Sequence, residues 1–160
     1  MKSNQLCTCK HPGIKKLLFI VLLSLGIANS NAQNKSKMEN QKIEAMIRQY
    51  TAAVDAQNVP EAEKFMDNYF RVVLTNFNNS GVTTILSREQ YTDMMRAGKV
   101  GGNKRQLTFL LADIHQPVAI VKVKLEGEKN VFTNYFSLVK TNDLWLIAQD
   151  IPQIQNKSNN

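Results

Sequence analysis

The chain has 160 residues and an ordinary globular composition, 43% hydrophobic and 21% charged, so a single domain is expected. Its 7 Gly and 4 Pro exclude a collagen-like or low-complexity chain. The net charge of +7 is concentrated at the start, because residues 1–32 hold four lysines and no acid. Residues 33–160 carry 16 basic and 13 acidic side chains, and this net of +3 is too small to indicate nucleic-acid binding.

Residues 1–32 have the three parts of a secretory signal peptide. Lysines precede an apolar run of 12 residues, Leu17 to Ala28, and Ser30 and Ala32 are small residues suited to cleavage before Gln33. At 1.5 Å per residue the run is about 18 Å long, against a hydrocarbon core of about 30 Å. We therefore predict an exported protein, periplasmic or secreted. An uncleaved leader that anchors the chain in a membrane is the alternative.

The mature chain offers few groups for metal or thiol chemistry. Both cysteines, Cys7 and Cys9, lie in the leader, which removes thiol catalysis and thiolate metal sites together. His115 is the one histidine after residue 32, so a histidine cluster cannot form. We predict neither a metal site nor a cofactor.

Helical patterns come first along the mature chain. Residues 33–39 are polar and predict a flexible tether. From about Asn40 the apolar residues recur at helical spacing through Tyr50 and Val54, which predicts an amphipathic helix of about four turns. Pro60 suits the first turn of a second, short helix. A capping box at Ser87-Arg88-Glu89-Gln90 begins a third helix.

The remaining segments are typical of strands. The first expected strand, Tyr69 to Phe77, precedes the third helix and ends at an Asn-rich turn. Later segments alternate apolar and polar residues, which predicts an antiparallel sheet with one buried face. These expected strands are Lys104–His115, Val118–Glu126, Val131–Lys140 and Leu144–Asp150. Residues 152–160 are polar and predict a disordered tail.

Two segments resemble a known superfamily. The helix end Tyr50-Thr51-Ala52-Ala53-Val54-Asp55-Ala56-Gln57-Asn58 is similar to the opening of nuclear transport factor 2-like domains, and the hairpin from Tyr135 to Ile147 is similar to their closing hairpin. The nearest subgroup is the "putative lumazine-binding" set, related to SnoaL-like and ketosteroid isomerase domains. The resemblance covers residues 40–151. It implies a cone-shaped α+β fold, three N-terminal helices packed on a strongly curved antiparallel sheet, often as a dimer.

The resemblance also suggests where a site would lie. Tyr50 falls where ketosteroid isomerases place an oxyanion-hole tyrosine, although a core-facing aromatic is the simpler interpretation. Asn134 falls at the place of their protonated Asp. The position of their carboxylate base falls near Val73 or Leu74, neither of which accepts a proton, so this isomerase chemistry is not expected.

Three other side chains remain candidates. Asp113 and His115 are two residues apart on an expected strand and therefore share a face, where they could form an acid/base pair or stand exposed beside a turn. Arg71 lies in an apolar strand and would suit an anionic ligand if it faces a pocket. Alternation equally allows this arginine to face solvent.

The leading hypothesis is an exported protein that binds a small, largely apolar molecule without transforming it. Polar contacts would come from Tyr50 and Asn134, and the pocket walls from Phe109, Phe136 and Leu138. An isomerase, dehydratase or hydrolase that uses Asp113 and His115 is the second hypothesis. A dimeric protein-interaction module is the third.

Overall fold

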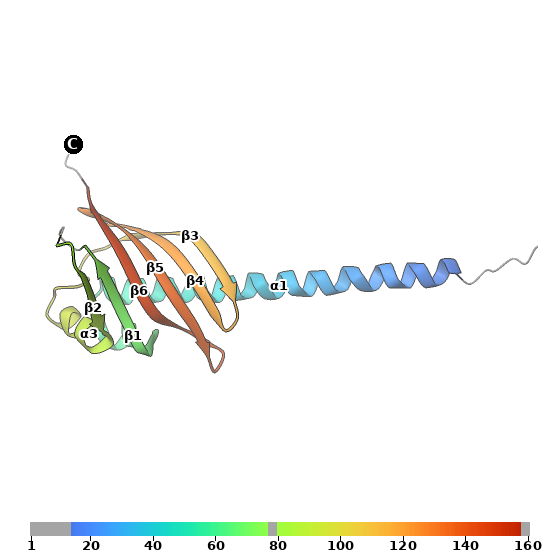
Figure 1. Ribbon diagram of the computed structural model, residues 1–160, viewed down its shortest axis with the longest axis horizontal. Helices are drawn as coiled ribbons and strands as arrows, with labels where there is room; N and C mark the ends of the chain where they lie inside the picture. Colours follow the sequence, from blue (N-terminus) through green and yellow to red (C-terminus); the bar gives the residue numbers. More distant parts are fainter. Residues whose placement is uncertain (1–13, 77–79, 158–160) are drawn as a thin grey trace, which may run out of the picture. The chain divides into compact units, whose positions relative to one another are not determined.

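The computed structural model describes residues 14–76 and 80–157, with side chains from residue 34 onward (Figure 1). The chain divides into two compact units, Met1–Glu39 and Asn40–Asn160. Cys7 and Cys9 lie outside the described residues, as does part of the predicted Asn-rich turn. The elements are α1 (Ile14–Asp55), α2 (Val59–Glu63), β1 (Met66–Thr75), β2 (Thr83–Ser87), α3 (Arg88–Arg96), β3 (Gln106–His115), β4 (Val118–Glu126), β5 (Asn130–Thr141) and β6 (Leu144–Asn156).

Helix α1 includes residues 33–39, where the sequence predicted a flexible tether. This segment contains Gln, Lys, Met and Glu, all good helix formers, and neither Gly nor Pro interrupts it. Polar composition alone therefore did not distinguish a tether from an exposed helix. Across the described part of the chain, no helix is both long and apolar enough to cross a membrane.

The two shorter helices begin at caps that the sequence encodes. Asn58 accepts a hydrogen bond from the Glu61 backbone at the start of α2. The capping box predicted for α3 is confirmed, since the Ser87 hydroxyl accepts from the Gln90 backbone at 3.2 Å and the Gln90 side chain accepts from the Ser87 backbone at 2.9 Å. These bonds fix where α3 starts.

The predicted α+β class is confirmed, but two details of the prediction are wrong. The six strands form one curved, open sheet in the order β2-β1-β6-β5-β4-β3. β1 pairs with β6 in parallel, so the sheet is mixed and not wholly antiparallel. Helix α3 follows β1 and β2 and is therefore not N-terminal to the sheet. Alternation within a strand does not encode the direction of a partner about 80 residues away, which is why the parallel pairing was missed. The position of α3 after a strand agrees with the order of elements read from the sequence, and only the description of three N-terminal helices fails.

Strand β6 continues beyond Asp150, where the sequence predicted a tail from residue 152. Residues Ile151 to Asn156 pair with Asn130 to Tyr135 of β5. Polar residues and a proline made this segment resemble a tail. Because one edge of the extension pairs with β5, the ladder holds it as a strand despite its composition.

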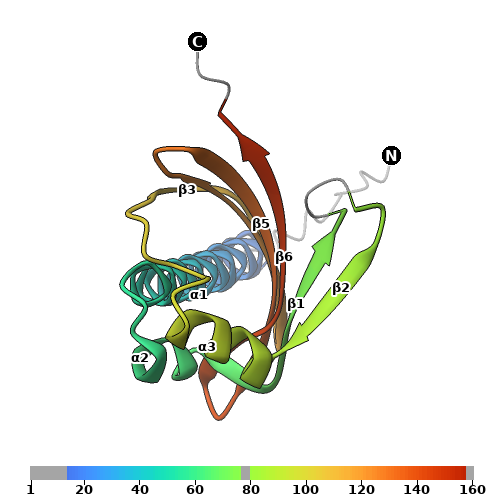
Figure 2. The same cartoon turned by 90° about the vertical axis from the view of Figure 1, so that its left-hand side faces the viewer.

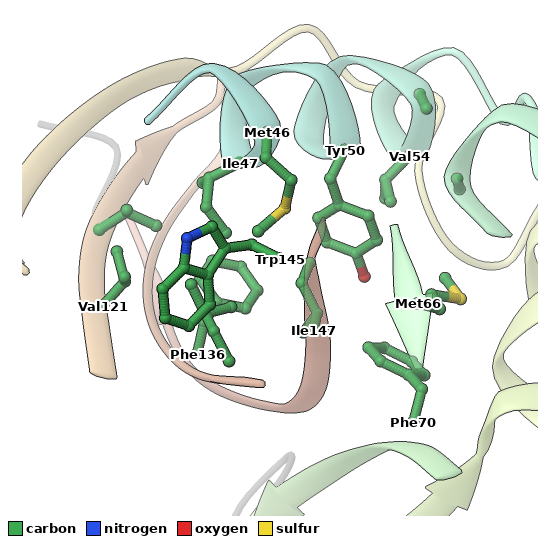
Figure 3. Packing of buried hydrophobic residues seen from close by; sticks show 14 of the residues in the cluster. Met46, Ile47, Tyr50, Val54, Met66, Phe70, Val121, Phe136, Trp145 and Ile147 are labelled. Atoms are coloured by element: carbon green, nitrogen blue, oxygen red, sulfur yellow. The ribbon is translucent and has the colours of Figure 1, made fainter. Parts of the chain in front are cut away.

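The core lies between the concave face of the sheet and the last turns of α1 (Figure 2). Ile47 and Tyr50 point from α1 toward Phe136 and Ile147 of the sheet (Figure 3). Tyr50 packs edge-on against Phe136, with ring centroids 6.0 Å apart. Phe136 and Ile147 are fully buried, so this part of the concave face is closed.

Candidate functional site

A pocket of about 370 Å³ opens on the concave side of the sheet. Its walls come from the end of α1, from α3, from β1, β2, β5 and β6, and from the loop between α3 and β3. Most of its wall is apolar, and this volume is within the range of small-molecule sites. The apolar lining residues include Val54, Val72, Leu74, Leu86, Met94, Phe132 and Ile154.

Two polar side chains lie together in this wall. The Asn134 amide Nδ2 on β5 donates to Asp150 Oδ1 on β6 at 2.7 Å. Both side chains are about 95% buried, and both line the pocket. The Asn134 Oδ1 atom is buried without a hydrogen-bond partner. A buried acceptor without a donor costs free energy, so this atom is a place where a ligand or a water would be stabilised.

A β-bulge places Asp150 in the pocket. Leu138 pairs with Ile147, whereas Ser137 pairs with Gln149, so Ala148 is an extra residue in β6. Side chains alternate across a strand, and the extra residue reverses which set faces inward. Asp150 therefore lies on the same face as Ile147. Without the bulge its carboxyl would point to the convex side.

Burial raises the pKa of the Asp150 carboxyl from 3.8 to about 7. The hydrogen bond from Asn134 and the positive charge of Arg105 both favour the charged form and lower this pKa, but burial outweighs them. The nearby Arg105 is itself paired with Asp55. The carboxyl thus lies in the pocket without an ion-pair partner of its own, and it exchanges its proton near neutral pH.

Two tyrosines lie beside this carboxyl. Burial raises the pKa of Tyr50 and of Tyr91 well above the usual phenol value, and the Asp150 charge raises both further. The two phenols interact, yet the Tyr50 hydroxyl has no partner at hydrogen-bond geometry. Tyr91 lines the pocket. Both phenols therefore remain protonated and neutral throughout the pH range in which Asp150 titrates.

The loop after α3 forms the rim of the pocket and is fixed to the end of α1. Arg105 Nε donates to Asp55 Oδ1 at 2.6 Å, and the Gln57 side chain donates to the Val100 carbonyl at 2.9 Å. Gly101 lies so close that a Cβ atom there would be 2.0 Å from the Val54 carbonyl oxygen. Its φ of +79° is in the left-handed region that glycine favours. The exposed Lys99 adds a positive charge at the rim.

The predicted wall residues lie at different places. Phe136 and Leu138 are fully buried in the core and are not among the pocket-lining residues. Phe109 on β3 is half-buried, with the Arg48 guanidinium over its ring at 5.3 Å. Of the predicted polar contacts, Asn134 lines the pocket, and Tyr50 is buried beside Tyr91.

The other predicted side chains face solvent. Arg71 is exposed on β1, where its Nε donates to Gln149 Oε1 at 3.0 Å, and it borders a separate open groove. Asp113 and His115 do meet, with Oδ1 and Nε2 3.3 Å apart, but their side chains are 64% and 85% exposed on the edge strand β3. Neither residue lines the pocket that contains Asp150.

Sequence reasoning missed Asp150, Tyr91 and the extension of β6. Strict alternation from Trp145 and Ile147 would place Asp150 on the outer face, and a bulge leaves no clear signal in a single sequence. Among the described residues, no group of three or more His, Cys, Asp or Glu side chains could hold a metal ion. The polar groups deep in the pocket wall are the Asp150 carboxyl, the Asn134 amide and the Tyr91 phenol, and Lys99, Asn103, Arg105, Asn130 and Asn156 also line the pocket.

Comparisons with known proteins agree with this architecture. A sequence model of the family described as "putative lumazine-binding" matches residues 38–151. The chain belongs to this family. No curated protein matches the chain. This chain has the nuclear transport factor 2-like fold, as its likeness to solved structures shows.

Among solved structures, an NTF2-like protein of unknown function from Silicibacter pomeroyi has a TM-score of 0.66 at 13% identity, covering 75% of this chain and 98% of that one. A second, from Shewanella baltica, has a TM-score of 0.64 at 13% identity, covering 75% and 96%. A putative scytalone dehydratase from Novosphingobium aromaticivorans has a TM-score of 0.58 at 14% identity, covering 77% and 88%. At these identities the likeness shows the fold alone, and the family's description suggests ligand binding.

Proposed function

We propose that this member of the family is an exported protein that binds a small, largely apolar molecule with one polar end. The observation that carries the proposal is the buried Asp150–Asn134 pair in the wall of a pocket of about 370 Å³. A buried carboxyl and an unpaired amide oxygen are costly to keep in an empty apolar cavity. A ligand that satisfies both groups would recover that cost. Tyr91 lines the pocket and supplies a further polar group, whereas the predicted contact Tyr50 is buried and is not among the lining residues.

Export rests on the leader, and binding rests on the pocket, so one preparation tests both. The protein is purified from its exporting host and measured by mass spectrometry. Under denaturing conditions we expect the mass of a chain whose first residue is Gln33. The native mass is expected to exceed an integer number of chains by one small molecule per chain. A native mass equal to the chains alone, together with no binding of added lumazine or of its 2-amino analogue pterin, would contradict the proposal. Lumazine is the first ligand to add because the family's description names it.

Two neighbouring positions on β1 give a matched pair of variants. Leu74 lines the pocket, whereas Val73 does not. Leu74→Trp is expected to fill the pocket and abolish the excess mass, while Val73→Trp is expected to retain it. Loss of the ligand in both variants would show that the bound molecule lies elsewhere.

Acid/base catalysis is the second candidate function, and one observation favours it. Groups that titrate near the working pH are efficient proton carriers, and Asp150 has a pKa of about 7 inside a pocket. The exposed Asp113–His115 pair lacks such an enclosure. Turnover of the co-purified molecule that disappears in Asp150→Asn and persists in His115→Ala would identify an enzyme. Release of the molecule unchanged would favour the binding protein.

A dimer is proposed on the convex face of the sheet. Several large apolar side chains are between 38% and 55% exposed there, more than an isolated sheet face usually presents. They are Leu111, Val118, Ile120 and Tyr135. The native mass gives the number of chains directly. A monomer at micromolar concentration would contradict this part of the proposal.

A further inference from the structure

The pocket wall carries two hydrogen-bond acceptors and lacks the donors that they need. Asp150 Oδ1 accepts from Asn134, and in the described part of the chain no other group donates to this carboxyl. The Asn134 Oδ1 atom is buried and unpartnered. Since the same two side chains are joined by a hydrogen bond, the free carboxyl oxygen and the free amide oxygen belong to one contiguous polar patch.

The groups around the patch do not supply the missing donors. Arg105 also lines the pocket, but it is paired with Asp55 through its Nε, its Nη2 and its backbone N–H. The phenols of Tyr50 and Tyr91 lie close enough to affect each other and to feel the Asp150 charge, but no hydrogen bond joins them to Asp150. When Asp150 is ionised, a ligand that pairs with both acceptors must therefore bring its own donors.

From this arrangement we propose that the pocket recognises a guanidine- or amidine-type edge, in which two adjacent N–H donors lie on one side of a flat, otherwise apolar ring. One donor binds the free oxygen of Asp150 and the other binds Asn134 Oδ1. The inference rests on the proposed ligand-binding function and specifies the chemistry of the ligand. Planar recognition of this kind is the counterpart of the paired bonds that a guanidinium makes to a carboxylate.

The inference separates two bicyclic compounds of nearly equal size. Pterin has an amino group on C2 beside its N3–H, which gives two adjacent donors. Lumazine has a carbonyl oxygen on C2, so its donors alternate with acceptors. Lumazine would place an oxygen against the Asp150 carboxyl and leave an acceptor unpaired. A site that hydrogen-bonds an N–H rejects an analogue without it.

The test is a fluorescence titration of the full mature protein with pterin and with lumazine. Pterin is expected to bind roughly tenfold to hundredfold more tightly. A second pair, 2-aminobenzimidazole and benzimidazolone, makes the same amino-to-carbonyl change on another ring and is measured by calorimetry. Equal affinities in both pairs, tighter binding of the carbonyl compounds, or no binding of either amino compound would overturn the inference.

Two variants test whether the Asp150 carboxyl causes the preference for the amino compounds. Asp150→Asn is expected to bring the two affinities of each pair to within about threefold, since an amide offers a donor as well as an acceptor. The matched control, Asp143→Asn, makes the same change at the fully exposed β5–β6 turn and is expected to keep the preference. An unchanged preference in Asp150→Asn would overturn the inference. The wild-type comparison decides it even if that variant does not fold.

A pH series supplies an independent measurement. Donors bind the ionised carboxyl, so the affinity for pterin is expected to rise from about pH 5 to about pH 7.5 and the rise is expected to vanish in Asp150→Asn. Of the neighbours that face this carboxyl, Tyr50 and Tyr91 stay neutral over this range because burial raises the pKa of both phenols, and Arg105 is paired with Asp55. An affinity that falls with rising pH would overturn the inference. The native mass separately decides whether the pocket binds any molecule, so the two failures are distinguishable.

Discussion

Two halves of the β5–β6 pair differ in what their inward side chains do. In one half, Phe136, Leu138 and Ile147 are buried under α1 and form the core. In the other half, Asn134 and Asp150 line a pocket. Phe136 pairs directly with Asp150, so the core and the pocket meet at this pair, and the bulge at Ala148 is what turns Asp150 to the inward face. One continuous sheet face is therefore structural at one end and available to a ligand at the other, and the boundary runs through the Phe136–Asp150 pair.

The largest expected effect on stability comes from truncating a core side chain in the structural half. Phe136→Ala removes a fully buried ring that packs against Tyr50, and it is expected to lower the free energy of unfolding by about 3–5 kcal/mol. Urea denaturation followed by circular dichroism measures this. As the control, Tyr69→Ala changes an aromatic residue on β1 that is 86% exposed, and it is expected to cost less than about 1 kcal/mol. Similar losses in both variants would mean that the buried ring stabilises the fold no more than the exposed one.

In the pocket half, a substitution is expected to stabilise the protein where Phe136→Ala destabilises it. Asp150→Asn removes a buried charge, and this is expected to raise the free energy of unfolding. The folded carboxyl holds its proton up to a pKa of about 7, whereas the unfolded carboxyl ionises near 3.8. The folded state therefore binds more protons between these values, and wild-type stability falls as the pH rises through this window. At pH 8 the variant is expected to be more stable by about 2–4 kcal/mol, and at pH 4 the difference is expected to be small.

Unfolding titrations at several pH values check this prediction, with Asp143→Asn as the control. The Asp143 side chain is fully exposed, so its variant is expected to follow the wild-type pH profile. A wild-type protein whose stability rises from pH 5 to pH 8 would contradict the sign derived for Asp150. Such a profile would mean that a cation beside the Asp150 carboxyl stabilises its ionised form in the folded protein.

A smaller effect is expected at the rim, where Gly101 joins the pocket loop to α1. Gly101→Ala places a Cβ 2.0 Å from the Val54 carbonyl oxygen, so the loop must shift away from the helix. We expect a loss of about 1–3 kcal/mol beyond that of Gly81→Ala. Gly81 has a similar φ of +70° but open space around it. The loss in Gly81→Ala therefore measures the cost of the backbone conformation alone, without a steric clash. Equal losses would show that the loop is not held against α1.

The structural half is the part that the sequence predicted well. Helical spacing identified Ile47, Tyr50 and Val54, all of which are buried. The capping box located α3 to the residue. These features are local, because each depends on side chains three or four positions apart. The resemblance to nuclear transport factor 2-like domains added the curved sheet and the concave face.

The pocket half was predicted poorly because its determinants are not local. Asp150 faces inward only because Ala148 is an extra residue, and that is decided by pairing with β5. Residues 152–156 form a strand only because the same partner is present. Asn134 was found through the resemblance and not through its pattern. The short strand β2, rich in polar residues, also escaped detection, since it is held by β1.

The smallest effect is expected from Tyr50→Phe, at the junction of the two halves. The ring belongs to the core, and its hydroxyl is buried without a partner. Removing an unpaired hydroxyl leaves the ring contacts intact, so the free energy of unfolding is expected to change by less than about 1 kcal/mol. Denaturation and a ligand titration measured together separate the two roles. If the hydroxyl gains its partner only from the ligand, affinity falls while stability stays constant. A loss of stability as large as that of Phe136→Ala would instead show that the hydroxyl is bound inside the protein, and it would assign Tyr50 wholly to the structural half.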